Sequence, residues 1–199
     1  IGGGGGLVGI VSGALSMGSL QSVATQTSSS GNVAVSISGT IQTGGNNSPA
    51  LVAQSIGGGG GWAAAADGQV DMGANTIGAS NNQAGSVNVT TNGAIQTAGI
   101  NSTGILAQSV GGGGGFLGIN TANDYRMLLG SSSSEGSNNS SDVSVDNKGT
   151  ITTTGNNSAA LIAHRIGGGG GSASVNWKGT ADRDGEASTP PLFLGGVDA

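Results

Sequence analysis

The chain has 199 residues, of which 43 are glycine, 8% are charged and none is cysteine. The net charge of −5 and the scattering of its five basic residues argue against nucleic-acid binding, and the lack of cysteine excludes disulfides and thiolate metal sites. No apolar run approaches the roughly 20 residues that a membrane-spanning helix needs. Repeated Val, Ile and Leu positions instead predict an ordered protein with a thin core.

A β-branched residue followed by five glycines recurs four times along the chain. The runs are Ile1–Gly6, Ile56–Gly61, Val110–Gly115 and Ile166–Gly171, and their starts lie 55, 54 and 56 residues apart. Glycine loses much conformational freedom on folding and weakens a strand, so a run at a fixed period indicates one recurring structural position. We therefore expect a single repeat array spanning 1–199, an excerpt of a longer chain, with repeats at 1–55, 56–109 and 110–165 and a partial repeat at 166–199.

Three units of 29 residues superpose without a gap and alternate with stretches of variable sequence. The units are Val33–Gly61, Val87–Gly115 and Val143–Gly171. In the first unit, Val33, Val35 and Ile41 alternate with small polar residues, and the apolar pattern resumes at either Leu51 or Val52. The second and third units repeat this pattern. Alternation over short runs predicts β-strands and no helix.

Glycine and asparagine separate the expected strands at the same places in every unit. Because both residues accept left-handed backbone angles, these places are predicted corners, and stacking would align Asn47, Asn101 and Asn157 as an amide ladder. The pattern favours an all-β fold, a parallel β-helix or β-solenoid, with about two coils per repeat stacked about 4.8 Å apart. A variable coil would then lie between the fixed coils and interrupt the ladder. About seven such coils would fit in the chain at this strand spacing.

The repeated motif reads G-x-I-x-T-x-G-x-N-S-x-x-L/I-x-A-x-S-I/V-G-G-G-G-G. It occupies Gly39–Gly61, Gly93–Gly115 and, with His164 and Arg165 in place of Gln-Ser, Gly149–Gly171. This motif resembles the repeat in the passenger domains of bacterial autotransporters. The resemblance covers under half of the chain and implies a right-handed parallel β-helix. It also implies an extracellular location on the bacterial surface and a non-catalytic function as a stalk, fibre or adhesin.

The glycine runs are the main candidates for an interaction role. The residues concerned are Gly57, Gly58, Gly59, Gly60, Gly61, Gly111, Gly112, Gly113, Gly114 and Gly115. No lysine or helix start follows a run, which excludes a phosphate loop, and no aspartate lies in phase for a calcium-binding glycine repeat. Either the same coil or a neighbouring rod could pack on the glycines. Expected partners are other copies, end to end or laterally, and a host or neighbouring-cell surface.

We expect no catalytic centre, metal or cofactor. His164 is the single histidine and replaces a glutamine of the repeat, so it is more simply a polar corner or surface residue. The carboxylates do not recur in phase, as a glycosidase pair on one face would require. The acidic groups are Asp67 with Asp71, Asp142 with Asp146, and Asp182 with Asp184 and Glu186; the last of these could offer oxygen ligands to calcium.

Three alternatives to a purely structural role remain open. Outward hydroxyls in Thr40–Thr43 and Thr150–Thr153 would suit an ice-binding face. Trp62 and Phe116, each directly after a glycine run, would be either sugar-stacking platforms or plugs of the coil interior, of which we favour plugs. The remaining alternative is a solenoid enzyme that degrades polysaccharides.

Overall fold

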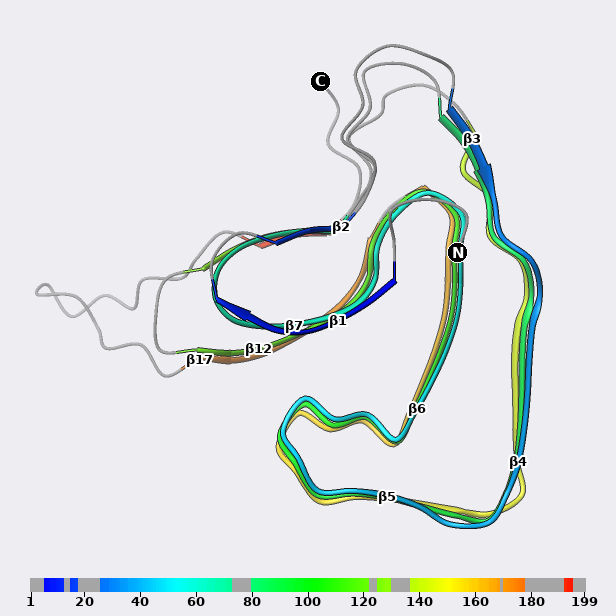
Figure 1. Cartoon of the computed structure of the whole chain (residues 1–199), viewed down its shortest axis with the longest axis vertical. Helices are drawn as coiled ribbons and strands as arrows, with labels where there is room; N and C mark the ends of the chain where they lie inside the picture. The colour runs from blue at the N-terminus through cyan, green and yellow to red at the C-terminus, as the bar shows by residue number, and fades with distance from the viewer. Residues whose placement is uncertain are drawn as a thin grey trace, which may run out of the picture.

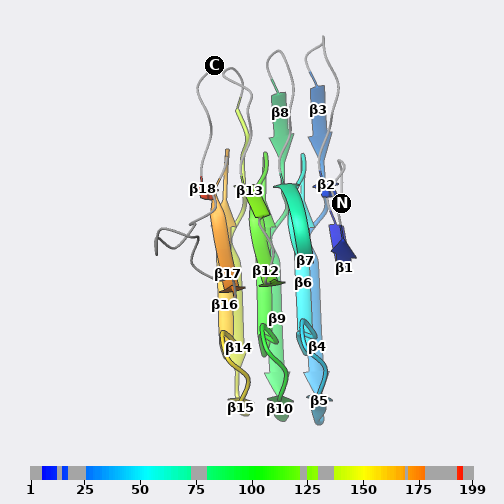
Figure 2. The ribbon, with the colours of Figure 1, turned by 90° about the vertical axis from the view of Figure 1, so that its left-hand side faces the viewer.

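The computed structural model describes residues 6–12, 15–17, 26–72, 80–121, 125–129, 137–168, 170–177 and 192–194. These residues form strands and connections without a helix, and hence contain no helix long and apolar enough to cross a membrane. Every pairing between the strands is parallel (Figure 2).

The strands follow one another in the same order in successive passes of the chain, which we call layers. The chain starts with β1 (Gly6–Ser12) and β2 (Leu15–Met17). The first layer contains β3 (Gln26–Ser29), β4 (Val33–Ser38), β5 (Ile41–Thr43), β6 (Leu51–Ile56) and β7 (Gly61–Met72). The second contains β8 (Ser80–Gln83), β9 (Val87–Asn92), β10 (Ala94–Thr97), β11 (Ile105–Val110), β12 (Gly115–Thr121) and β13 (Tyr125–Leu129). The third contains β14 (Val143–Asn147), β15 (Thr150–Thr153), β16 (Leu161–Ile166), β17 (Gly171–Trp177) and β18 (Leu192–Leu194).

Equivalent residues of successive repeats pair directly with each other. Ile95 of β10 pairs with Ile41 of β5 on one side and with Ile151 of β15 on the other. No strand lies between them, so the expectation of two coils per repeat, with a variable coil between fixed ones, is wrong, as is the coil count drawn from it. Each repeat of about 55 residues makes one coil, because the variable stretch completes the pass that the fixed unit begins.

A single pass is long because the chain folds back inside it. Figure 1, which looks along the stack, shows β4, β5 and β6 following three sides of one lobe. After β6 the chain reverses, and β7 runs outward to form a second lobe. The turn between β6 and β7 coincides with the glycine run Gly57–Gly61. The glycines therefore separate the two lobes of each layer.

Apolar side chains fill both faces of the sheet formed by β6, β11 and β16. On one face, Ile105 and Ala107 of β11 join Val87, Val89 and Ile95 in the core of the first lobe. On the other face, Leu106 packs with residues at the start of β7 and β12: Trp62, Ala64 and Phe116. The sequence left open whether Leu51 or Val52 resumes the apolar pattern. Both do, because Leu51 packs against the core of the first lobe and Val52 packs against the core on the other face of the sheet.

Candidate functional site

The glycine runs build a buried turn in which backbone packs on backbone. Gly57–Gly61 and Gly111–Gly115 are buried. Gly60 and Gly114 have φ of 92° and 98°, a region that side chains disfavour. The N–H of Gly58 donates to the carbonyl of Gly111 at 2.6 Å, so the hydrogen-bonded ladder continues through the turn. Side chains are excluded here by conformation and by space together.

In the first and second layers, the glycine turn also lies against the segment that leads to the next layer's first long strand. A Cβ added to Gly57 would be 2.7 Å from the carbonyl oxygen of Gln83, and one on Gly111 would be 2.6 Å from that of Asn139. The glycines therefore pack on the next coil of the same rod, which is neither of the two partners that the sequence left open. In the first and second layers the buried glycines leave no surface for a neighbouring rod.

The repeated asparagine lies at the corner between β5 and β6. Asn47, Asn101 and Asn157 have φ of 51°, 54° and 55°, the left-handed conformation that their residue type tolerates. The side-chain amide of Asn101 donates to Oδ1 of Asn47 at 3.2 Å, and Ser174 of β17 donates to Oδ1 of Asn101 at 3.0 Å. Since no other coil intervenes, the predicted interruption of this ladder is wrong. The corner instead ties successive layers to each other and to the second lobe.

The serine after each asparagine joins neighbouring layers. Oγ of Ser102 accepts the N–H of Ser48 at 3.1 Å and donates to the carbonyl of Gly45 at 2.8 Å. Ser158 makes the same pair of bonds to Ser102 and Gly99, at 2.9 and 2.8 Å. In the sequence these serines only follow the asparagines of the repeated motif, which does not by itself predict bonds between layers. Their recurrence in all three units was the available signal.

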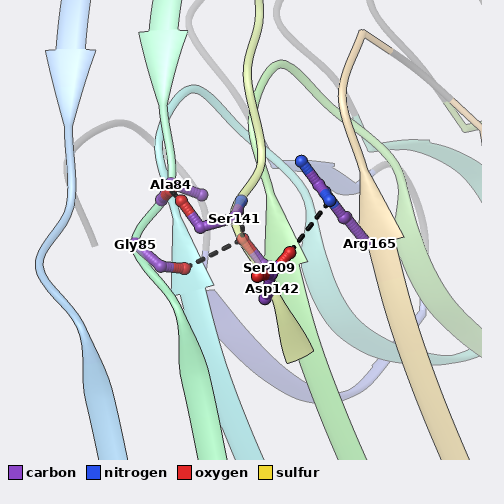
Figure 3. A network of polar contacts seen from close by, with 6 residues as sticks. All are labelled: Ala84, Gly85, Ser109, Ser141, Asp142 and Arg165. Atoms are coloured by element: carbon purple, nitrogen blue, oxygen red, sulfur yellow. Dashed lines mark hydrogen bonds and ion pairs between the residues drawn. The ribbon is translucent and has the colours of Figure 1, made fainter. Parts of the chain in front are cut away.

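A second serine of the repeat, Ser109, forms a hydrogen bond across the first lobe, from β11 to the segment before β9. Oγ of Ser109 donates to the carbonyl of Gly85 in its own layer and accepts the N–H of Ser141 in the next, both at 2.9 Å (Figure 3). The third layer has Arg165 at this position. Its guanidinium forms an exposed ion pair with Asp142 at 2.9 Å. In the third layer an ion pair therefore stands where the second layer has the hydrogen bond from Ser109 to Gly85.

A row of polar side chains runs along the stack, from layer to layer, on the sheet of β6, β11 and β16. The amides of Gln54 and Gln108 lie 2.7 Å apart, and the Gln108 amide lies 3.3 Å from Nδ1 of His164. Gln108 is fully buried. With its amide nitrogen oriented towards the Gly61 carbonyl and its oxygen towards the Phe116 N–H, each at 3.2 Å, it joins β11 to the first residues of β7 and β12. The sequence pattern does not predict this row.

Acidification is expected to weaken the folded state through His164. Burial lowers the pKa of His164 below its ordinary value of 6.5, so the unfolded chain takes up the proton at a higher pH than the folded chain does. The stabilising contribution is therefore complete above about pH 6.5 and is lost as the pH falls through the lowered pKa. Urea midpoints at about pH 7.5 and pH 5 measure the effect. His164→Gln, which restores the repeat residue, should reduce it; equal pH sensitivity would contradict the assignment.

The candidate catalytic and metal-binding groups do not assemble in the part of the chain that the structure describes. Asp142 pairs with Arg165, and Asp146 pairs with Lys148 at 3.4 Å, both on the surface. Within those residues no group of three or more His, Asp or Glu side chains could hold a metal ion. The side chains of Asp67 and Asp71, and the cluster Asp182, Asp184 and Glu186, lie outside what is described.

The ice-binding alternative would require a regular outward array of threonine hydroxyls on successive layers. Thr43 and Thr153 turn inward, and each donates to a serine carbonyl at 2.8 Å. The second layer presents Ala94 and Gln96 outward, so these described strands form no regular hydroxyl array.

Trp62 and Phe116 pair in adjacent strands and are only 3% and 2% exposed. They fill the space between the lobes, so the favoured prediction of interior plugs is confirmed and the sugar-stacking alternative is wrong.

No family model, curated protein or solved structure matches the chain.

Proposed function

We propose that the chain is part of a right-handed parallel β-solenoid that serves as a non-catalytic structural or adhesive rod. The observation that carries this proposal is the residue-for-residue register between equivalent strands in three layers, as in β5, β10 and β15. In such an array each layer is stabilised mainly by its neighbours, so a rod lengthens by repetition. Right-handedness is supported by the strong preference of parallel strands in one sheet for right-handed connections.

An extracellular location on a bacterial surface is part of the same proposal. It is supported by the resemblance of the repeat to autotransporter passenger domains and by the polar, almost uncharged composition. Serine, threonine and asparagine hold the layers together, as at Ser48, Ser102 and Ser158, and the sequence contains no cysteine. Surface labelling of intact producing cells with an antibody against the chain tests the location, and labelling only after lysis would contradict it.

Self-association is also proposed, with the unpaired strands as the surfaces involved. In the described sheets, β4, β5 and β6 form one edge of the stack and β14, β15 and β16 form the other. Open edges of this kind pair readily with further strands. The glycine turns are a less suitable contact for a neighbouring rod, because they are buried in two of the layers.

Removal of one whole layer is expected to give a shorter rod that still folds. Deleting residues 56–109 joins Ser55 to Val110, which is the residue that follows an equivalent serine in the repeat. The strands on either side of the deletion then keep the register that they need, and the stack should shorten by about 4.8 Å. Small-angle scattering measures the length, and circular dichroism should retain the β signal.

A deletion out of phase provides the matched control. Removing residues 56–103 joins Ser55 to Gly104, so strands no longer meet their equivalents and each outward residue meets the wrong neighbour. This variant should lose cooperative unfolding. If both deletions behaved alike, or if the in-phase deletion did not fold, the rod of repeated layers would be the wrong description.

A further inference from the structure

An open groove of about 230 Å³ lies on the outer face of β5, β10 and β15. Gln42, Gln96 and Thr152 occupy the same outward position in successive layers and line one side. Ala98 and Thr154, which directly follow the ends of β10 and β15, line the other side. Because these residues come from neighbouring layers, the groove runs along the axis of the stack. Figure 2 shows the three strands side by side at one end of the molecule.

The polar groups in the wall formed by Gln42, Gln96 and Thr152 are free to bind a ligand. The side chains of Gln42, Gln96 and Thr152 are exposed and form no hydrogen bond with any described residue. The floor is different, because the hydroxyls of Thr43 and Thr97 turn inward and donate to the carbonyls of Ser48 and Ser102. A ligand would therefore meet two amides and a hydroxyl that already face solvent, and no internal bond needs to break.

The spacing and charge of these groups select the class of ligand. Like positions recur about every 4.8 Å along the groove, whereas an extended peptide presents side chains on one face about every 6.8 Å and would fall out of phase. No charged residue lines the groove, which disfavours phosphate-bearing or acidic polymers. A sugar unit in an extended polysaccharide is roughly as long as the strand spacing, and its hydroxyls can donate to and accept from amides.

We infer that this groove binds an extended, uncharged polysaccharide, aligned with the stack and with about one sugar unit per layer. The inference extends the proposed adhesive role by naming a ligand class. It rests on that proposal only for the stacking of the layers, and the site itself needs the sheet of β5, β10 and β15 alone.

Cellohexaose is a suitable probe, because it is extended, uncharged and long enough to cross all three layers. Titration followed by backbone amide NMR should show shifts confined to β5, β10, β15 and the residues directly after them. An open groove with few contacts should bind weakly, with Kd of about 1 mM. Cellobiose, which spans fewer layers, should bind at least about tenfold more weakly. Polygalacturonate, an acidic polymer, should not compete.

Variants of the groove locate the binding. Gln42→Ala combined with Gln96→Ala removes both amides and should weaken cellohexaose binding at least about tenfold. Ala98→Gln narrows the groove and should have a similar effect. Asn88→Ala, which removes an exposed amide on β9 in the second layer, is the matched control and should bind like the native chain. Melting temperatures should stay unchanged, because the exchanged groups make no internal bond.

Several results would overturn the inference. One is no binding of cellohexaose by the native chain, and another is equal binding by the native chain and both groove variants. Tighter binding of polygalacturonate, or loss of self-association rather than of sugar binding in the groove variants, would assign the surface to another partner. None of these results affects the outcome of the layer deletions. Failure of the sugar-binding inference and failure of the proposed rod are therefore distinguishable.

Discussion

Gly114→Ala is expected to destabilise the folded chain by about 4 kcal/mol, from backbone strain and overpacking together. Gly114 has φ of 98°, and a Cβ added there would overlap the carbonyl oxygen of Gly170 in the next layer. The methyl group cannot move away, because the glycine turn is held by hydrogen bonds to the layers on both sides. Urea unfolding followed by circular dichroism measures the loss as a lower midpoint.

The third layer supplies a matched control for this substitution. Gly170 has nearly the same backbone angle, with φ of 99°, but no heavy atom lies within 4 Å of the place where its Cβ would be. Gly170→Ala therefore introduces strain without overlap and should cost only about 1–3 kcal/mol. A larger loss for Gly114 shows that contact between layers fixes the glycine. Equal losses would mean that the backbone angle alone requires it.

The sequence allowed the strands and corners to be predicted because both depend on local patterns. Alternation placed Val87, Val89 and Ile95 on one face, and all three lie in one core. The expectation of a corner at Asn101 is met by a left-handed asparagine there. The number of coils per repeat was predicted wrongly, since a period measures the length of chain between equivalent positions and contains no information on how often the chain turns within it.

The polar groups that join the layers were harder to find for a different reason. Ser102 and Gln108 are both fully buried, yet their types and the residues around them are those of a surface strand or loop. Their partners lie in other layers or in the second lobe, such as Gly45 for Ser102 and Phe116 for Gln108. Only the direct stacking of repeats and the fold-back at the glycines bring these groups together, and neither follows from local pattern.

The fold-back also predicts that the sheet of β6, β11 and β16 needs apolar residues on both faces. Leu106→Ala should destabilise the chain by about 3 kcal/mol, because it leaves a cavity beside Trp62 and Phe116. Had only one face of the sheet been covered, Leu106 would face solvent and its truncation would cost less than about 0.5 kcal/mol. Urea unfolding distinguishes the two values.

Ile162→Ala is the matched control for Leu106→Ala, because Ile162 pairs with Leu106 but is only half-buried in the third layer. The loss of stability in Ile162→Ala should be about half that in Leu106→Ala, because less apolar surface leaves the core and water can fill the space. Trp62, which is 3% exposed, reports on the same core, and its fluorescence should shift to longer wavelength in Leu106→Ala when measured in a Trp177→Phe background. A loss in Ile162→Ala that equalled or exceeded that in Leu106→Ala would show that the space between the lobes is not the packed interior on which the two-lobed layer depends.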